Sequence, residues 1–231
     1  MDKHLIVGMG EIGQAIKAIF KDAQTLDLES KDIMSPLEVL HICFPFSESF
    51  VDDVITYQHR FNPSHTIIYS TVPIGTTKQI LGAVHSPIEG RHPELELSIR
   101  TMPRWIGVND NEEGFFFTGL FTDKYINTRQ VFNSDFTEFL KIRSIAKYGI
   151  NLIWTDYEKS VADKIDMDFE LLKEFDRDYN KLYHELGENW AQRYILDPPE
   201  GKIGGHCLVP NAKLLNEQYP NEWLEKLANY E

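Results

Sequence analysis

Three glycines near the start of the sequence have the spacing of a dinucleotide-binding turn. Gly8, Gly10 and Gly13 form a G-x-G-x-x-G pattern between an apolar run at residues 5–7, which predicts a buried strand, and a helical pattern at residues 12–20. In such a unit the first glycine permits a tight turn, the second lets the backbone approach a pyrophosphate, and the third lets helix and strand pack closely. The N–H groups at the start of the helix then face a diphosphate.

An acidic residue suits the ribose of the same cofactor. Asp27 lies in a second short strand at residues 25–28, at the separation from the first glycine that is expected of a ribose ligand. A carboxylate there accepts hydrogen bonds from the ribose hydroxyls and repels a 2′-phosphate, so the sequence predicts NAD rather than NADP. We expect Glu11 and Ile12, in the first helical turn, and Pro45, after the third strand, to line the same site. The alternative is a similar turn that holds no cofactor.

A cysteine near the end of the chain is the candidate nucleophile. Cys207 follows Gly204, Gly205 and His206, and the glycines remove side chains from around the thiol. A thiolate acts as a nucleophile where cations or helix N-termini stabilise it. Taken alone, a loop cysteine beside glycines is more often just a small residue. The eight histidines lack metal-ligand spacing, so we propose no metal.

The order of the elements predicts how these residues are positioned. Strands and helices alternate up to about residue 133, which is the order of a doubly wound parallel sheet in an α/β protein. The expected strands after the first two are residues 38–43, 65–70, 83–85, 104–108 and 124–131, and the expected helices are one capped by Ser47 and those at 76–81 and 112–120. We predict a Rossmann-like NAD-binding domain at residues 1–133, with its ligands at the carboxyl ends of the strands.

Helical patterns dominate the rest of the chain. Residues 135–164 have the pattern of a single long helix, in which Gly149 is the one helix-breaking residue, and such helices often join domains or subunits. Helices at 168–186 and 188–196 follow, then a loop at 197–207 and two short helical segments. We predict a helical domain at residues 134–231 and a homodimer formed through the helix at 135–164.

The composition favours a protein that acts on small molecules. A chain of 231 residues can bury a sizeable core, and no stretch is long and apolar enough to span a bilayer. The net charge of −13 disfavours nucleic acid and anionic membranes as partners. The first four residues lead directly into a strand, so no signal peptide is predicted, and two distant cysteines make no disulfide framework. We expect a cytoplasmic protein.

Five motifs occur in an order that resembles one enzyme family. They are Gly8-Met-Gly-Glu-Ile-Gly13, Ser70-Thr-Val-Pro-Ile-Gly-Thr-Thr77, Ser86-Pro-Ile-Glu89, Glu138-Phe-Leu-Lys141 and Gly204-Gly-His-Cys207. In this order they resemble the UDP-glucose/GDP-mannose 6-dehydrogenase family over nearly the whole chain. The resemblance implies an NAD-binding Rossmann domain and a helical domain with a long central dimer helix. The third, nucleotide-binding domain of the family has no counterpart in this sequence.

The resemblance also implies roles for individual residues. Enzymes of this family oxidise the C6 alcohol of a nucleotide sugar to a carboxylate in two hydride transfers. By resemblance, Cys207 attacks the aldehyde, the thiohemiacetal delivers a second hydride to NAD, and the thioester is hydrolysed. Thr71 positions water or the nicotinamide, and Lys141 stabilises the oxyanion. From its type alone, a lysine on the inner face of a helix is also an ordinary salt-bridge partner.

Some positions depart from the family pattern. Ile145 stands where the family has an asparagine, and its side chain cannot hydrogen-bond a substrate. Asn211 stands where the family has an aspartate and cannot act as a carboxylate base. Ile88 displaces Glu89, the candidate catalytic carboxylate, by one residue. We expect NAD binding to survive, and covalent aldehyde oxidation and recognition of a full UDP-sugar to be weakened.

The sequence therefore supports three hypotheses. The leading one is a compact NAD-dependent dehydrogenase related to nucleotide-sugar 6-dehydrogenases, which oxidises an alcohol or sugar. A β-hydroxyacid dehydrogenase-like enzyme would need a lysine on the long helix but neither the cysteine nor a third domain. A non-catalytic NAD-binding protein derived from the family is the third, and Ile145 and Asn211 motivate it.

Overall fold

The computed structural model describes residues 3–27, 33, 36–91, 93–201, 203 and 205–230, with the backbone alone at 205 and 206. The chain divides into two compact units, Met1–Ile142 and Arg143–Glu231. The predicted strand end at Leu28 and the first glycine of the cysteine motif, Gly204, lie outside the described residues. The predicted domains, 1–133 and 134–231, stay a proposal, since the division by compactness falls within the long helix.

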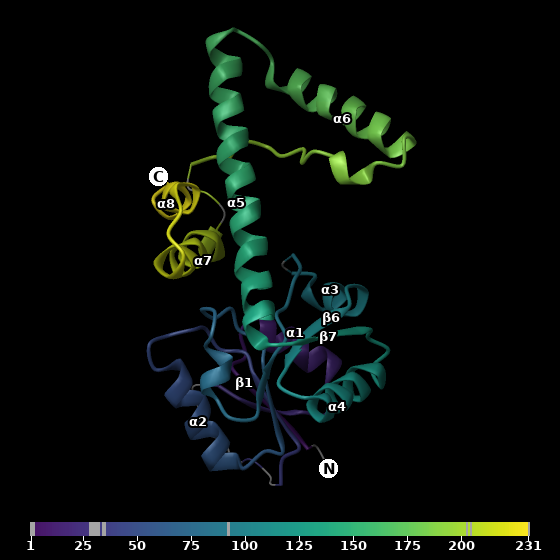
Figure 1. The fold of residues 1–231 in the computed structure, drawn as a ribbon, viewed down its shortest axis with the longest axis vertical. Coiled ribbons are helices and arrows are strands. Elements are labelled where there is room, and N and C mark those ends of the chain that lie inside the picture. Colours follow the sequence, from purple (N-terminus) through teal and green to yellow (C-terminus); the bar gives the residue numbers. More distant parts are fainter. Residues whose placement is uncertain are drawn as a thin grey trace. The chain divides into compact units, whose positions relative to one another are not determined.

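A seven-stranded sheet forms the centre of the first unit, in the order β2-β1-β3-β4-β5-β6-β7 (Figure 1). The strands are β1 His4–Val7, β2 Gln24–Leu26, β3 Val39–Ile42, β4 His65–Ile68, β5 Ala83–His85, β6 Arg104–Val108 and β7 Thr128–Phe132. The first five strands pair in parallel, and β7 pairs in parallel with β6. The prediction of a Rossmann-like α/β sheet is confirmed.

One strand pair differs from the predicted parallel order. The β6 strand pairs with β5 in the antiparallel direction, with His85 opposite Gly107. The start of β6 therefore lies at the carboxyl end of β5, where the Arg104 side chain binds the carbonyl of Ser86. In the sequence, Arg104 is simply the polar first residue of a predicted strand, and nothing in the pattern indicates this bond.

Helices cover both faces of the sheet. One face packs against α1 Glu11–Ile19, α3 Leu95–Thr101 and α4 Asn111–Thr122. The other packs against α2 Phe50–Phe61 and a 3-10 turn at Thr77–Gln79, where the sequence predicted a helix at 76–81. The α3 helix was not predicted from the sequence, because a single pair of apolar residues, Leu95 and Ile99, does not establish a helical period.

The second unit is helical. The predicted long helix is confirmed as α5 Ser134–Lys164, which begins in the first unit and continues into the second. It is followed by α6 Phe169–Glu185, α7 Gly205–Gln218 and α8 Glu222–Ala228. Gly149 has a packing role in α5, because a Cβ there would lie 2.5 Å from Leu208 of α7 and 2.7 Å from Leu227 of α8. The residue that interrupts the helical pattern thus allows the three helices to pack closely.

The helix predicted at residues 188–196 is wrong. Only Asn189–Ala191 forms a 3-10 turn, and residues 192–196 after it have no regular secondary structure. The side chain of Asn180 in α6 pairs with the backbone of Arg193, donating to its carbonyl at 2.9 Å and accepting from its N–H at 2.7 Å. Those backbone groups are therefore paired with a side chain distant in sequence rather than with helical neighbours.

No helix within the described ranges is both long enough and apolar enough to cross a membrane. Cys43 and Cys207 are free thiols. Burial raises the pKa of the Cys43 thiol, which agrees with an inert core residue.

Candidate active site

Two of the three turn glycines are required by the packing of the protein itself. Gly8 leaves β1 with a φ of 90°, and a Cβ there would lie 2.8 Å from the Phe44 backbone nitrogen. A Cβ on Gly13 would lie 1.9 Å from the carbonyl oxygen of Gly8. The turn after β1, the start of α1 and the end of β3 therefore touch through backbone atoms.

Gly10 has no such constraint. Its φ is −66°, and no described atom lies within 4 Å of the position that a Cβ would take. Gly10 is the N-cap of α1 and offers no side chain to cap the first N–H groups of this helix. Glu11 is exposed and Ile12 is half-buried in the first turn. The open space over Gly10 and the uncapped helix start fit the diphosphate of a dinucleotide.

The other predicted cofactor residues follow the same edge of the sheet. Val7 and Leu26 are paired in register, so Gly8 and the exposed Asp27 follow neighbouring strand ends. The sheet order reverses between β1 and β3, and the exposed Pro45 follows β3. Ligands of such sheets bind at this point, outside the carboxyl ends of the strands. The Asp27 carboxylate suits a ribose, so the residues present fit NAD.

The start of α5 holds the loop that contains Thr71. Glu138 is fully buried, and its carboxylate accepts hydrogen bonds from Gly75 N–H at 2.6 Å and Thr77 N–H at 2.7 Å. Burial raises the pKa of Glu138, while the hydrogen bonds from Thr77 and Gly75 act in the opposite direction. Thr71 is half-buried at the start of this loop, directly after β4 and Ser70.

The structure brings Lys141 and Glu89 together. The Lys141 ammonium donates to the carbonyl of Ile88 at 2.6 Å and lies 3.7 Å from the Glu89 carboxylate. The side chains of this pair are 14% and 27% exposed, so the charges are mostly shielded from water but not sealed. Ile88, which displaces Glu89 relative to the family motif, is buried in the core, and its carbonyl accepts the hydrogen bond from Lys141.

His85 is buried between the two loops. Its Nε2 lies 3.1 Å from the Ser70 carbonyl and its Nδ1 lies 2.9 Å from the Thr137 hydroxyl. Because a carbonyl can only accept, Nε2 carries the proton in a neutral ring and Nδ1 accepts from Thr137. Burial lowers the pKa of His85 to about 4, the Ser70 carbonyl raises it in part, and the charges of Arg104 and Lys141 lower it further.

We expect His85 to make stability fall as the pH falls. The pKa of His85 lies below its ordinary 6.5 in the folded chain, so the unfolded chain takes up the proton first. The stabilisation is complete above about pH 6.5 and is lost towards pH 4, a change of about 3 kcal/mol. Urea unfolding of the wild type and of His85→Gln at several pH values should show their difference shrinking by that amount. Parallel profiles would contradict the expectation, since Glu138 titrates in both proteins.

Cys207 and Asn211 lie in the second unit. Cys207 is exposed in the first turn of α7, whereas the sequence placed it in a loop, because α7 already begins at Gly205. Asn211 donates from its side-chain amide to the Cys207 carbonyl at 2.7 Å, one helical turn back. Ile145 packs against the apolar cluster that includes Leu208 and Leu227. Its apolar character therefore serves the core of this unit.

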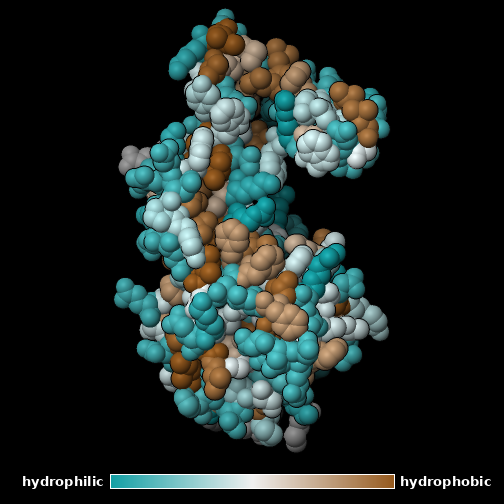
Figure 2. Space-filling view, viewed as in Figure 1, coloured by the Kyte–Doolittle hydropathy of each residue, from teal (hydrophilic) through white to brown (hydrophobic). Residues whose placement is uncertain are grey.

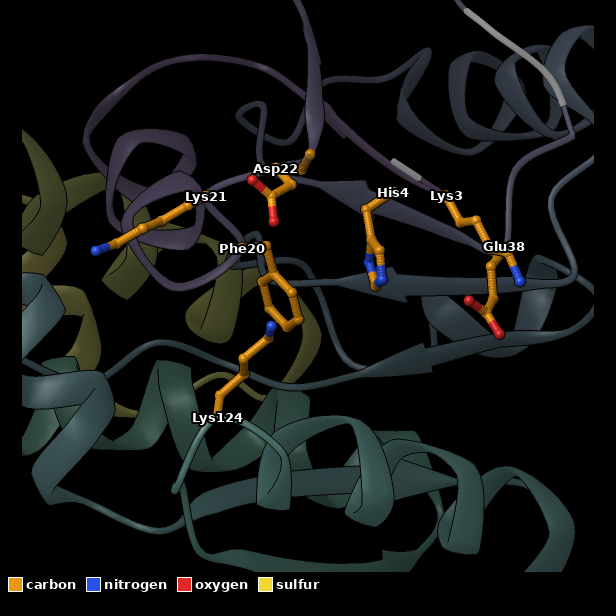
Figure 3. Close-up of a pocket in the computed structure, with 8 residues that line it drawn as sticks. Lys3, His4, Phe20, Lys21, Asp22, Glu38 and Lys124 are labelled. Carbon is orange, nitrogen blue, oxygen red and sulfur yellow. The ribbon is translucent and has the colours of Figure 1, made fainter. Parts of the chain in front are cut away.

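A cavity of about 240 Å³ lies at the opposite edge of the sheet (Figure 3). It is lined by charged side chains of both signs around His4, the first residue of β1: Lys3, Lys21, Lys124, Asp22 and Glu38. The C-terminal end of α1 adds partial negative charge at Phe20. Because the lining charges are mixed, the cavity favours neither an anionic nor a cationic ligand. It lies at the amino ends of the strands, whereas the predicted site lies at their carboxyl ends.

Sequence reasoning missed two buried polar residues around the loops, Thr137 and Arg104, and took His85 as an exposed residue, although it is buried. The available signal was a polar side chain inside an apolar strand pattern, as at His85 and Arg104. Among the residues that the structure describes, no group of three or more histidine, cysteine or acidic side chains is placed to hold a metal ion.

The comparisons with known proteins concern the fold. No protein-family model and no curated protein matches the sequence. A UDP-D-ManNAc dehydrogenase from Pyrococcus horikoshii is similar in structure with a TM-score of 0.78 and 16% identity, over 97% of this chain and 67% of that chain. A GDP-mannose dehydrogenase from Pseudomonas aeruginosa has a TM-score of 0.64 and 15% identity, over 97% of this chain and 67% of that chain.

A second class of enzyme shares this fold. The 3-hydroxyisobutyrate dehydrogenase of Mycobacterium tuberculosis has a TM-score of 0.68 and 10% identity, over 99% of this chain and 92% of that chain. The chain therefore has the fold of nucleotide-sugar dehydrogenases and of 3-hydroxyisobutyrate dehydrogenases, which supports the resemblance seen in the motifs.

Proposed function

We propose that this chain is an NAD-dependent dehydrogenase that oxidises an alcohol or sugar. The observation that carries the proposal is that one edge of the sheet holds both the Gly8–Gly13 turn and the half-buried Lys141–Glu89 pair. When bound, NAD supplies the hydride acceptor. The helix start after Gly10 would bind its diphosphate, and Asp27 would bind the adenosine ribose.

Residues of the first unit could stabilise the negative charge and accept the proton that arise during hydride transfer. An alcohol that loses a hydride must also lose its hydroxyl proton, so negative charge develops on its oxygen. The Lys141 ammonium would stabilise that charge, and Glu89 beside it would take up the proton. Thr71, on the loop held by Glu138, would position the nicotinamide or a water molecule.

In the nucleotide-sugar mode, Cys207 completes a second oxidation. Its thiolate would add to the aldehyde carbon to form a thiohemiacetal, whose carbon would give a hydride to a second NAD while its hydroxyl loses a proton. Water would then hydrolyse the resulting thioester to a carboxylate and the free thiol. Asn211 would not act as the base, because it has no carboxylate and its amide is bonded to the Cys207 carbonyl. Water activation in this mode would therefore depend on a group other than Asn211.

The hydroxyacid mode is the second candidate. Lys141 and Glu89 suffice for one hydride transfer and lie together in the unit that lacks Cys207. A single oxidation to a ketone would need no covalent intermediate. The fold shared with 3-hydroxyisobutyrate dehydrogenase supports this mode.

A substrate panel with NAD tests the proposal. The panel contains nucleotide sugars and small hydroxy acids, and NADH formation is followed by absorbance. In the nucleotide-sugar mode the wild type yields two NADH per substrate, and Cys207→Ser yields one and stops at the aldehyde. In the hydroxyacid mode Cys207→Ser is unchanged.

The third hypothesis predicts a different result from the same panel. A chain that binds NAD but stays silent on every compound, with a Cys207 thiol no more reactive to alkylation than free cysteine, would be a non-catalytic NAD-binding protein. Cys43 is an internal control for alkylation, because it is buried. Cytoplasmic residence and the exclusion of nucleic acid and membranes as partners stay predictions from composition.

We also infer a homodimer formed through α5. Large apolar side chains are exposed along one stripe of α5, and another set is exposed on α6, which has no buried residue (Figure 2). They are Trp154, Tyr157 and Val161 on α5, and Leu171, Phe175 and Leu182 on α6. Spacing by three, four or seven residues puts each set on one helix face. Sedimentation should give a dimer, and Tyr157→Glu with Val161→Glu should give a monomer; a monomeric wild type contradicts this.

A further inference from the structure

The Ser86–Glu89 loop carries two of the groups that meet Lys141. The Ile88 carbonyl accepts from the Lys141 ammonium at 2.6 Å, and the Glu89 carboxylate lies 3.7 Å from it. The position of the ammonium therefore depends on the path of this loop. A short loop with an inserted residue, as here, needs its backbone carbonyls held if its path is to be fixed.

Arg104 holds the other half of the same loop. It is the first residue of β6 and is 2% exposed. Its Nη2 donates to the Ser86 carbonyl at 2.8 Å and to the Ser86 hydroxyl at 3.0 Å, and it also binds the Pro87 carbonyl. The antiparallel pairing of β6 with β5 is what brings this side chain to the end of β5.

Arg104 is poorly explained as a residue that only stabilises the core. Burial lowers the pKa of Arg104 to about 10, so the guanidinium stays charged at neutral pH at a cost in desolvation. Its Nε is buried and has no partner within the described residues. An apolar side chain of similar volume often replaces a buried charge without loss of stability. The hydrogen bonds to Ser86 and Pro87 are the feature that an apolar side chain could not supply.

We propose that Arg104 is a positioning residue, which fixes the Ser86–Glu89 loop so that Ile88 and Glu89 hold the Lys141 ammonium in place. The effect of Arg104 on catalysis rests on the proposed function, in which Lys141 touches the substrate. The positioning of Lys141 by Arg104 is inferred from the contacts that both side chains make with the Ser86–Glu89 loop.

The test compares the wild type with Arg104→Met, which keeps the volume and removes the donors. The first readout is the rate at which acetic anhydride modifies Lys141, measured by peptide mass spectrometry. We expect it to rise by about tenfold, as for the loss of one hydrogen bond to a charged group. The second readout is amide hydrogen exchange of residues 86–91, which should become faster.

Two internal references separate positioning from general loosening. Lys17 lies in the same unit, and carbonyls of Lys21 and Ala23 also hold its ammonium, both at 2.6 Å. We expect its modification rate to stay unchanged in Arg104→Met. Arg100→Met is the matched control, because Arg100 is an exposed arginine of α3 that pairs with Glu96. It should leave both readouts at the wild-type level.

Each outcome decides the proposal without needing turnover. A selective rise at Lys141 and in the 86–91 peptide supports it, even if no substrate is found. An unchanged Lys141, or an equal rise at Lys141 and Lys17, overturns it. If Arg104→Met does not fold, Arg104→Lys takes its place in the same comparison. Where turnover is available, kcat should fall while the KM for NAD stays the same.

Discussion

Replacing Gly13 by alanine is expected to abolish tight NAD binding and to destabilise the first unit. The new Cβ would lie 1.9 Å from the Gly8 carbonyl oxygen, and no side-chain rotation relieves this contact because the backbone fixes the position of a Cβ. The turn and the start of α1 must move apart. We expect the free energy of unfolding to fall by about 3 kcal/mol. NAD affinity should fall at least about tenfold, because the helix start no longer faces the diphosphate. Calorimetric titration and urea unfolding measure the two effects.

Two other glycines serve as matched controls. Gly10→Ala introduces a Cβ that meets no described atom, so stability should hold while NAD affinity falls if the diphosphate passes over this residue. Gly119→Ala, in α4, also meets no described atom and lies away from the turn, so both measurements should stay near wild type. Full NAD affinity in both Gly13→Ala and Gly10→Ala would place the cofactor elsewhere or remove it.

Replacing Lys141 by methionine should lower kcat by about a thousandfold with NAD affinity unchanged. The ammonium is the cation that the first unit holds beside Glu89, and a positioned cation or acid-base group contributes effects of this size. The loss should appear in kcat, since Lys141 contacts neither the Gly8–Gly13 turn nor Asp27 in the described structure. Steady-state kinetics on the substrate identified by the panel measures it.

A charge-preserving variant separates the roles of Lys141. Lys141→Arg keeps a cation but does not give up a proton. Activity nearer to the wild type than to Lys141→Met would indicate oxyanion stabilisation, and activity as low as that of Lys141→Met would indicate proton transfer. Lys181→Met, at an exposed position of α6, is the control and should leave turnover unchanged. Wild-type kcat in Lys141→Met would remove this residue from the chemistry.

Much of the fold could be predicted because its signals are local. The apolar run before Gly8 and the helical periodicity at residues 12–20 predicted β1 and α1, and β5 and β6 were predicted with the bounds that the structure has. The long helix was predicted within one residue of its start. In each case a run of apolar residues or a helical period lies within one element, so the sequence carries the signal directly.

The failures share a cause, which is pairing between distant residues. The helix expected at 188–196 does not form beyond Ala191, where the side chain of Asn180 pairs with the backbone of Arg193. The antiparallel direction of β6 relative to β5 could not be predicted from the residues of β6, because they suit parallel and antiparallel pairing equally well. Cys207 lies in a helix rather than in the predicted loop, because α7 begins two residues before it, at Gly205, and the sequence suggests a loop at this glycine.

The candidate site shows the same division. The residue types and spacing of the sequence by themselves predicted a dinucleotide turn and an acid, Asp27, that suits a ribose, and the family resemblance named Lys141, Glu89 and Cys207 as candidate reactive side chains. The structure alone decided that Lys141 meets Glu89 and the Ile88 carbonyl, and that Glu138 and Arg104 hold the loops on which Thr71 and Glu89 lie.

The physical reason lies in how the two kinds of information are encoded. A glycine at a positive φ or beside a close backbone contact is a local requirement, and Gly8 and Gly13 are fixed by it. A buried charge such as Arg104 or Glu138 is defined by partners 18 and more than 60 residues away. Such partners are brought together only when the sheet and α5 have formed, so the sequence specified the turn and tertiary packing assembled the loops around Lys141.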